Sequence, residues 1–365
     1  MSDLYIGLMS GTSLDGADGI LVDFSDPKLH VLASSTQSFS SDFRTELLAL
    51  NSPTHNELHR AAQAANQLTE VYAKVVSALL HDAGLAAKNI QAIGAHGQTV
   101  RHQPTAGYTL QLNNPALLAE RTGINVVADF RSRDVAAGGQ GAPLVPAFHQ
   151  SVFCQPGQTT LVLNIGGIAN LSVLPATGDV LGFDCGPGNA LVDAWCLQHT
   201  GQRFDESGQW AASGQLIPAL LASLLDEPYF SILPPKSTGR DLFSMGWLAQ
   251  KLQTFTKHPP EDVQNTLTEF TAKACIAGAS SYLKNSKELI ACGGGAFNQH
   301  LMQRLQAGLP SLKVVSSDAH GLPPLQVEAA AFAWLARQTM LRLPGNLPSV
   351  TGATGLRVLG AIYPA

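Results

Sequence analysis

One local pattern occurs twice in this chain of 365 residues, once near the start and once near the middle. Residues 5–23 read as an apolar strand, a polar turn with two glycines, and an apolar returning strand. Residues 160–174 repeat that order, again with two glycines in the turn. An ordinary hairpin does not need so polar a tip. Two similar α/β domains facing each other across a cleft would explain why the unit recurs.

Predicted helices and strands alternate between the two turns. Thr54 to Glu57 reads as a capping box that opens a long helix, and Gly84 is a typical residue to end it. A buried strand follows over residues 90–95. Asn114 with Pro115 then starts a shorter helix, which Gly123 closes. This alternation predicts a parallel or mixed sheet in an α/β fold.

Length and composition limit the possible classes of protein. At roughly 150 residues per domain the chain holds two, and we expect residues 1–133 with about 325–365 to form the first and residues 134–324 the second. A net charge of −5 argues against a nucleic-acid partner. The chain has no uninterrupted apolar run of membrane-spanning length, and residues 1–5 lack the basic region and apolar run typical of a signal peptide. We therefore expect a cytoplasmic protein without a membrane partner. The five scattered cysteines are expected to be reduced thiols.

The two polar turns offer groups that bind phosphate. Glycine-rich backbone can form an anion-binding nest, and Asp15 could hold Mg²⁺ directly or through water. A single such turn could simply be a tight hairpin, but Gly166, Gly167 and Asn170 supply the same chemistry again. Neither a P-loop nor a dinucleotide fingerprint is present. The candidate phosphate-binding residues of the first turn are Gly11, Thr12, Ser13, Leu14, Asp15, Gly16, Ala17 and Asp18.

Two later segments add candidates of other kinds. Gly293, Gly294 and Gly295 lie between a predicted strand and helix, where a flat ligand could approach the backbone. With Asn298 they are adenosine-contact candidates, and a plain strand–helix turn is the alternative. Asp184 follows a predicted strand and is well placed for a general base, with an Asx-type turn as the alternative.

Four polar residues are candidates for binding a further substrate. Arg131 could grip a carboxylate or form a salt bridge between domains. Glu328 begins an apolar helix and could interact with the helix dipole or accept hydrogen bonds from sugar hydroxyls. Gln98 and Thr99 follow a strand. No role is assigned to His96, Arg133, Lys236 or Arg240.

The run from Met9 to Asp18 closely resembles the opening motif of anhydro-N-acetylmuramic acid kinases. The resemblance implies the sugar kinase–Hsp70–actin fold, in which two RNase H-like α/β domains flank an interdomain cleft. It continues in order through nearly the whole chain, in residues 96–99, 129–146, 164–170, 183–189, 235–240, 292–298, 328–336 and 343–346.

The same resemblance implies a reaction and its participants. With Mg²⁺ and ATP, the enzyme opens the 1,6-anhydro bridge of its sugar with water and phosphorylates the released oxygen, as part of peptidoglycan recycling. Asp184 would activate the water. The two turns, Gly293 to Gly295 and Asn298 would bind ATP. The sugar would be contacted by Gln98, Thr99, Arg131 and Glu328. An N-acetylhexosamine kinase and a non-catalytic actin- or chaperone-like switch are the alternatives. The sequence allows a homodimer without requiring one.

Overall fold

The computed structural model describes residues 3–11, 14–26, 28–239 and 241–365. The predicted phosphate ligands Thr12 and Ser13 lie outside the described residues, as does Arg240. The chain divides into two compact units, residues 1–152 with 326–365, and residues 153–325. The division falls after Val152 and not after residue 133, because the segment that follows residue 133 is hydrogen-bonded to the C-terminal segment.

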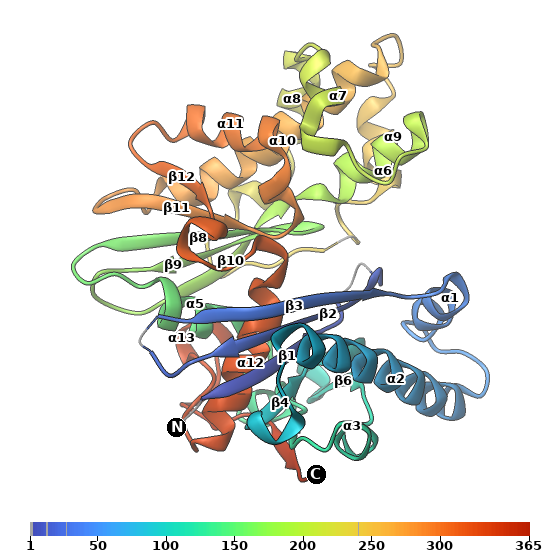
Figure 1. Cartoon of the computed structure of the whole chain (residues 1–365). Helices are drawn as coiled ribbons and strands as arrows, with labels where there is room; N and C mark the ends of the chain where they lie inside the picture. Colours follow the sequence, from blue (N-terminus) through green and yellow to red (C-terminus); the bar gives the residue numbers. More distant parts are fainter. Residues whose placement is uncertain (1–2, 12–13, 27, 240) are drawn as a thin grey trace. The chain divides into compact units, whose positions relative to one another are not determined.

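The first unit is built on a six-stranded sheet with the order β13-β7-β4-β1-β2-β3 (Figure 1). β1, β2 and β3 form an antiparallel meander, while β4 and β7 run parallel to β1. β13, at the C-terminus of the chain, closes the far edge by pairing antiparallel with β7. The strands are β1 (Leu4–Met9), β2 (Gly16–Asp23), β3 (His30–Ser38), β4 (Ala92–Ala95), β7 (Val126–Ala128) and β13 (Ala361–Tyr363), and a separate hairpin joins β5 (Gln98–Gln103) to β6 (Tyr108–Leu112).

Helix α12 (Val327–Met340) lies unusually close to the centre of this sheet. A Cβ atom on Gly7 in β1 would stand 1.8 Å from the carbonyl oxygen of Ala329. One on Gly94 in β4 would stand 2.0 Å from another carbonyl oxygen of the same helix. Only glycine permits this approach, and it fixes the start of α12. The unit's other helices are α1 (Ser41–Ala49), α2 (Glu57–Ala83), α3 (Pro115–Thr122), α4 (Ser132–Ala136), α5 (Val145–Phe153), which ends just beyond the boundary, and α13 (Pro348–Thr351).

The second unit repeats the sheet topology of the first. Its five strands have the order β10-β9-β8-β11-β12, with β8 antiparallel to β9 and parallel to β11. The shared order confirms the predicted pair of RNase H-like α/β domains. The strands are β8 (Thr159–Ile165), β9 (Ile168–Leu174), β10 (Leu181–Pro187), β11 (Ser286–Cys292) and β12 (Lys313–Ser316), and the helices are α6 (Asn189–Thr200), α7 (Gln209–Ser213), α8 (Pro218–Leu225), α9 (Met245–Leu252), α10 (Pro260–Ser280) and α11 (Gln299–Gly308).

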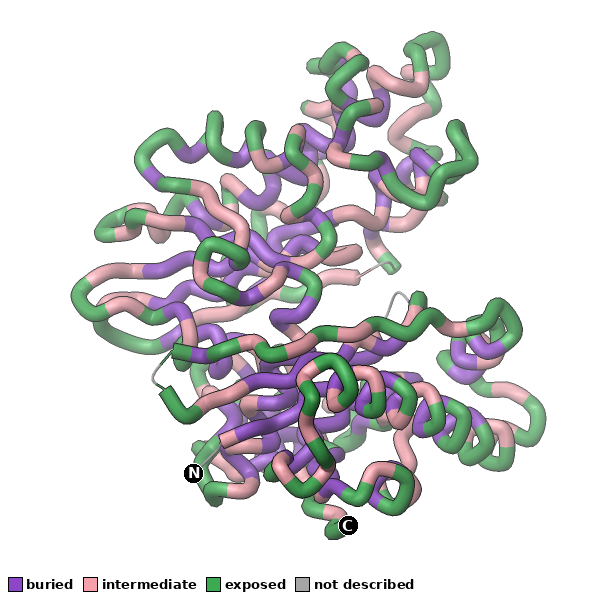
Figure 2. Tube along the Cα trace, viewed as in Figure 1, coloured by how far each residue is buried: buried purple, intermediate pink, exposed green. Residues whose placement is uncertain are grey.

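Each unit has its own apolar core. Figure 2 shows burial along the strands of each sheet and the helices packed on them. A further cluster in the second unit lies among its helices and includes the buried rings of Phe243 and Phe270. The described part of the chain contains no helix long and apolar enough to span a membrane.

One predicted helix start is wrong. α2 begins at Glu57 behind Asn56, whose side chain makes no capping hydrogen bond. The Thr54 hydroxyl is not a cap, because it accepts a hydrogen bond from Arg60 Nη1 at 2.8 Å. The predicted end at Gly84 is confirmed, with a left-handed φ of 64°, and so are both predicted ends of α3.

Candidate functional site

The first predicted phosphate turn joins β1 to β2 and is held at both ends by its backbone. The Leu14 amide donates to the Gly11 carbonyl at 3.3 Å, and the Asp15 carbonyl accepts from the Phe39 amide at 3.1 Å. Leu14 has a left-handed φ of 59°. The Asp15 side chain is exposed and lies 3.4 Å from Arg44 Nη1. The end of the turn therefore presents an accessible carboxylate at Asp15, whose own carbonyl is hydrogen-bonded to Phe39.

Two other predicted residues of this run belong to the sheet. Gly16 pairs with Ser38, and a Cβ on Gly16 would stand 2.5 Å from the Gln37 carbonyl oxygen. The side chain of Ala17 is completely buried in the core. Any contact of these two residues with a phosphate would have to come from the backbone.

Asp18, the last residue of the run, belongs to a group of interacting charges. Its Oδ1 accepts a hydrogen bond from Thr36 Oγ1 at 2.6 Å. Burial raises the pKa of the Asp18 carboxyl, and Asp15 adds to this while the Thr36 bond opposes it. Burial also raises the pKa of Glu328, with Asp18 adding to the rise and Arg131 opposing it. The structure thus brings Asp18, Arg131 and Glu328 within electrostatic range of one another.

Arg131 is positioned by a neutral histidine. Its Nε and Nη2 approach His96 Nε2 at 3.1 and 3.0 Å, and its Nη1 donates to the Gly141 carbonyl at 2.8 Å. Arginine has no acceptor, so His96 Nε2 must be unprotonated. Burial and Arg131 hold the pKa of His96 well below its usual value. Burial lowers the pKa of Arg131 to about 10, against the attraction of Glu328.

The predicted sugar contacts Gln98 and Thr99 begin β5. Gln98 is buried, and its Oε1 accepts a hydrogen bond from the Ser10 hydroxyl, directly before the first turn. Thr99 Oγ1 accepts from Gln111 Nε2 at 3.3 Å. Gln98 is thus hydrogen-bonded to the residue before the turn, and Thr99 is only partly buried. Contact of either residue with a sugar stays a prediction.

Sequence reasoning assigned no site role to a buried carboxylate three residues beyond Arg131. Asp134 is fully buried, and its Oδ1 accepts from Asn346 Nδ2 at 2.7 Å and from the Thr351 hydroxyl at 2.8 Å. Its Oδ2 accepts from the Gly141 amide at 2.8 Å. Asp134 therefore fastens the loop around Arg131 to the C-terminal segment. Its place as the last acidic residue before the long stretch without charges was the available signal.

The second predicted phosphate turn, between β8 and β9, is fastened through its carbonyl groups. The Gly166 oxygen accepts from the Asn189 amide at 2.8 Å, and the Gly167 oxygen accepts from the amides of Gly188 and Ala190 at 3.0 and 3.1 Å. The amides of Gly166 and Gly167 themselves donate no hydrogen bond within the described structure. Both are therefore available to an anion.

Close packing of three segments holds this turn in place. A Cβ on Gly188 would stand 2.3 Å from the Gly166 oxygen. One on Gly293, whose φ is 77°, would stand 2.5 Å from Asn164 Oδ1, and one on Gly295 would stand 2.3 Å from Ile165. These glycines allow the segment after β11 to pack against the end of β8. This packing supports the alternative that Gly293 to Gly295 form a plain strand–helix turn. It does not test whether they contact adenosine.

The remaining ATP candidates of the second unit lie on neighbouring backbone. Asn298 Oδ1 accepts from the Leu301 amide at 3.0 Å and caps α11. Asn170 lies in β9, opposite Asn164 and Asp184. Gly294 begins the short 3₁₀ turn that leads to α11. Their contacts with a nucleotide stay predictions.

Asp184, the candidate base, lies within β10, which runs beyond its predicted end to Pro187 with an irregularity after Asp184. Its Oδ2 accepts a hydrogen bond from the Thr238 amide at 2.9 Å, and its own amide donates to the Lys236 carbonyl at 3.1 Å. Oδ1 has no hydrogen-bond partner among the described residues. Burial raises the pKa of this carboxyl, and the Thr238 bond opposes the rise. The carboxylate is therefore fixed by one oxygen, more basic than usual, and open at the other.

The segment around Thr238 supplies further polar groups that the sequence left without roles. Tyr229 Oη donates to the Asp184 carbonyl at 2.7 Å. Lys236 Nζ lies 4.6 Å from the centroid of the Tyr229 ring, and burial lowers the pKa of Lys236. Thr238 Oγ1 is buried and has no hydrogen-bond partner within the described structure. Cys185 is buried, and its interaction with Cys275 and burial hold its thiol pKa well above the usual value, which fits a packing role.

Comparison of the whole chain with known proteins gives matches to one family. A family model described as anhydro-N-acetylmuramic acid kinase matches residues 3–365. A protein of Albidiferax ferrireducens named "Anhydro-N-acetylmuramic acid kinase" is 64% identical, over 100% of both chains. A relative from Variovorax paradoxus with the same name is 63% identical, over 100% of this chain and 99% of its own.

A solved structure resembles the chain in fold alone. Component A of the (R)-2-hydroxyglutaryl-CoA dehydratase of Acidaminococcus fermentans superposes with a TM-score of 0.52 at 11% sequence identity. The match covers 93% of this chain and 99% of that one.

Proposed function

This chain belongs to the anhydro-N-acetylmuramic acid kinase family, and we propose that it uses ATP and water to convert 1,6-anhydro-N-acetylmuramic acid into N-acetylmuramic acid 6-phosphate. The close relatives do not favour a hexosamine kinase or a non-catalytic nucleotide switch. The product would enter peptidoglycan recycling, and the use of ATP fits a cytoplasmic location.

The proposed reaction couples two bond exchanges. A water oxygen bonds to the anomeric carbon while the bond from that carbon to the bridging oxygen breaks. The released oxygen attacks the γ-phosphorus of ATP, and ADP leaves. One proton of the water passes to the Asp184 carboxylate, and the other stays on the new anomeric hydroxyl. A single base therefore serves both exchanges.

The geometry of Asp184 is the observation that carries this proposal. Oδ2 is occupied by the Thr238 amide, whereas Oδ1 is open to accept a proton from water. A raised pKa makes the carboxylate a better proton acceptor than an ordinary aspartate. The Lys236 carbonyl accepts a hydrogen bond from the Asp184 amide, and the Thr238 amide donates one to the Asp184 side chain. Because both the backbone and the side chain of Asp184 are held, the base is preorganised.

ATP would be bound by glycine backbone in the second unit and by the carboxylate-bearing turn in the first. The unpartnered amides of Gly166 and Gly167 suit phosphate oxygens. Asp15 and Asp18 offer the oxygen ligands that Mg²⁺ prefers. The described residues include no cluster of three metal-binding side chains, so one or two carboxylates, water and phosphate oxygens would hold the ion. When bound, Mg²⁺ would neutralise phosphate charge.

The sugar would be bound by the charged group of the first unit. Arg131 has no ion-pair partner within the described structure and can donate to a carboxylate or hydroxyl of the sugar. Glu328 can accept from sugar hydroxyls, and the close approach of α12 to the sheet fixes its position. Gln98 and Thr99 complete the set of proposed sugar contacts.

Replacing the base tests the proposal. Asp184→Asn keeps an acceptor for the Thr238 amide but cannot take a proton, so we expect turnover to fall by about 10³-fold or more while ATP binding survives. Asp179→Asn makes the same change at an exposed aspartate in the same unit and should leave turnover unchanged. Near-normal turnover of Asp184→Asn would remove Asp184 from the role of base.

Substrate competition tests the reaction itself. The purified protein with Mg-ATP should form one ADP and one sugar 6-phosphate for each 1,6-anhydro-N-acetylmuramic acid consumed. A higher specificity constant for free N-acetylglucosamine would show a hexosamine kinase instead.

A further inference from the structure

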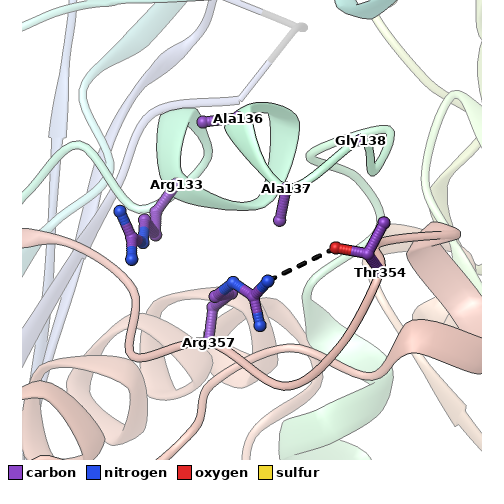
Figure 3. Close-up of a pocket in the computed structure, with 6 residues that line it drawn as sticks. All are labelled: Arg133, Ala136, Ala137, Gly138, Thr354 and Arg357. Atoms are coloured by element: carbon purple, nitrogen blue, oxygen red, sulfur yellow. Dashed lines mark hydrogen bonds between the residues drawn. The ribbon is translucent and has the colours of Figure 1, made fainter.

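A pocket in the first unit is lined by two arginines. It lies beside the hydrogen bonds that join Asp134 to the C-terminal segment. It has a volume of about 390 Å³. Arg133 comes from α4 and Arg357 from the C-terminal segment, and no acidic residue is among the lining residues. Figure 3 shows both guanidinium groups at this pocket, with Arg357 bonded to Thr354. The lining residues are Arg133, Ala136, Ala137, Gly138, Thr354 and Arg357.

Neither arginine is neutralised by a carboxylate of the described chain. Arg357 Nη1 donates to the Leu356 carbonyl at 2.9 Å, and Nη2 donates to the Thr354 hydroxyl at 3.3 Å. These partners are uncharged. Arg133 is exposed and makes no ion pair with any described acidic group. The pocket therefore carries two uncompensated positive charges in a protein of net charge −5.

Hydrogen bonds fix the two walls of the pocket relative to each other. The Thr354 amide donates to the Ala137 carbonyl at 2.9 Å. The Arg357 amide donates to Asn346 Oδ1 at 2.7 Å, and Asn346 Nδ2 donates in turn to buried Asp134. The positions of the two arginine backbones are therefore set before any ligand arrives, which lowers the entropic cost of binding.

The pocket is separate from the contacts made by Arg131. Arg131 directs its guanidinium to His96 and Gly141. Arg133 follows two residues later, and residues two apart on a helix do not face the same way. The proposed reaction accordingly makes no use of Arg133 or Arg357.

We propose that this pocket binds a small phosphate-bearing dianion, either inorganic phosphate or a phosphate monoester. Guanidinium groups match the oxygen geometry of phosphate in bidentate contacts. Two of them balance a dianion, and the Thr354 hydroxyl can supply another donor. The volume is large enough for a phosphorylated monosaccharide as well as for the free ion.

Calorimetric titration of the full-length protein tests this site. Inorganic phosphate and glucose 6-phosphate are titrated separately, with sodium acetate as the monoanion. We expect saturable binding of at least one phosphate compound and at least tenfold weaker binding of acetate. Similar affinities for the two phosphate compounds would identify a site for the phosphate group itself, whereas preference for glucose 6-phosphate would identify a monoester site.

Substitutions separate this pocket from the glycine turns, which also suit phosphate. Arg357→Gln and Arg133→Gln should each weaken binding at least tenfold, and Arg357→Lys should weaken it less because it keeps the charge. Arg203→Gln removes an exposed arginine of the second unit and should change nothing. Unchanged binding in the Arg133→Gln, Arg357→Gln double variant, or no saturable binding by the unmodified protein, would overturn the proposal.

Discussion

The two glycine turns occupy the same position in two sheets of the same topology, but they are built from different chemistry. The first follows β1 and carries Asp15, whose side chain is exposed, and Asp18 follows in β2, where it pairs with Met9. The second follows β8, and its two glycines are fastened through their carbonyls to the start of α6. The first turn and the start of β2 present side-chain carboxylates, whereas the second turn presents backbone amides.

This difference indicates which kind of ligand each turn is equipped to bind. Carboxylates suit a cation and amides suit an anion, so the first turn is equipped for Mg²⁺ and the second for phosphate. Substitutions in each unit test this comparison, and the largest effect is expected in the second turn.

The largest effect is expected where a side chain would displace the second turn. Gly293→Ala places a Cβ 2.5 Å from Asn164 Oδ1 at the end of β8, and we expect about 100-fold lower kcat/KM because misplaced binding groups are costly. Gly157→Ala is the matched control, since Gly157 also has a φ of 77° but nothing within 4 Å of the new atom. Steady-state kinetics and thermal melting measure both variants. Equal losses in the two would show that backbone strain, not displacement of the turn, is responsible.

A smaller effect is expected from the charged group of the first unit. Glu328→Gln removes a charged hydrogen-bond acceptor, and we expect the KM for the sugar to rise about 10-fold with little change in the KM for ATP. Glu120→Gln, on the exposed face of α3, is the control and should match the unmodified protein. A change confined to the KM for ATP would assign Glu328 to the nucleotide instead.

Sequence reasoning recovered much of the fold because its signals were local. The two strand–turn–strand units, Gly84 and Asn114 were readable from residue type and spacing, since a helix end or a tight turn depends on a few neighbouring residues. The capping role predicted for Thr54 was wrong because its hydroxyl accepts a hydrogen bond from Arg60. Arg60 is in turn paired with Glu46 on another helix, which local sequence does not reveal.

The candidate site was less accessible to sequence reasoning, because its contacts join distant segments. Asp134 is bonded to Asn346 and Thr351, more than two hundred residues away. The Thr238 amide donates a hydrogen bond to the Asp184 side chain, although several helices lie between the two residues in the sequence. No spacing rule links such pairs, although Asp184 after a predicted strand and Glu328 at the start of an apolar helix could be identified as candidates from their local sequence.

The smallest effect compares the buried carboxylates of the two units. Burial raises the pKa of both Asp18 and Asp184, so each ionised form destabilises the fold at neutral pH, and that cost disappears as pH falls below the raised pKa. Asp18→Asn and Asp184→Asn should therefore each raise Tm at pH 7 by about 2 °C. Melting at pH 7 and at pH 4 measures this, and the gain should shrink at pH 4. A lower Tm for Asp184→Asn at pH 7 would show that its ionised form stabilises the fold.

The fate of the water oxygen tests the central claim most directly. The reaction is run in ¹⁸O-water with Mg-ATP and 1,6-anhydro-N-acetylmuramic acid, then quenched early, and the position of the label is found by mass spectrometry. Unlabelled product kept in ¹⁸O-water for the same time corrects for exchange at the anomeric centre. The account predicts one ¹⁸O at the anomeric carbon and none in the phosphoryl group. Label in the phosphoryl group, or a product without label beyond the exchange control, would contradict it.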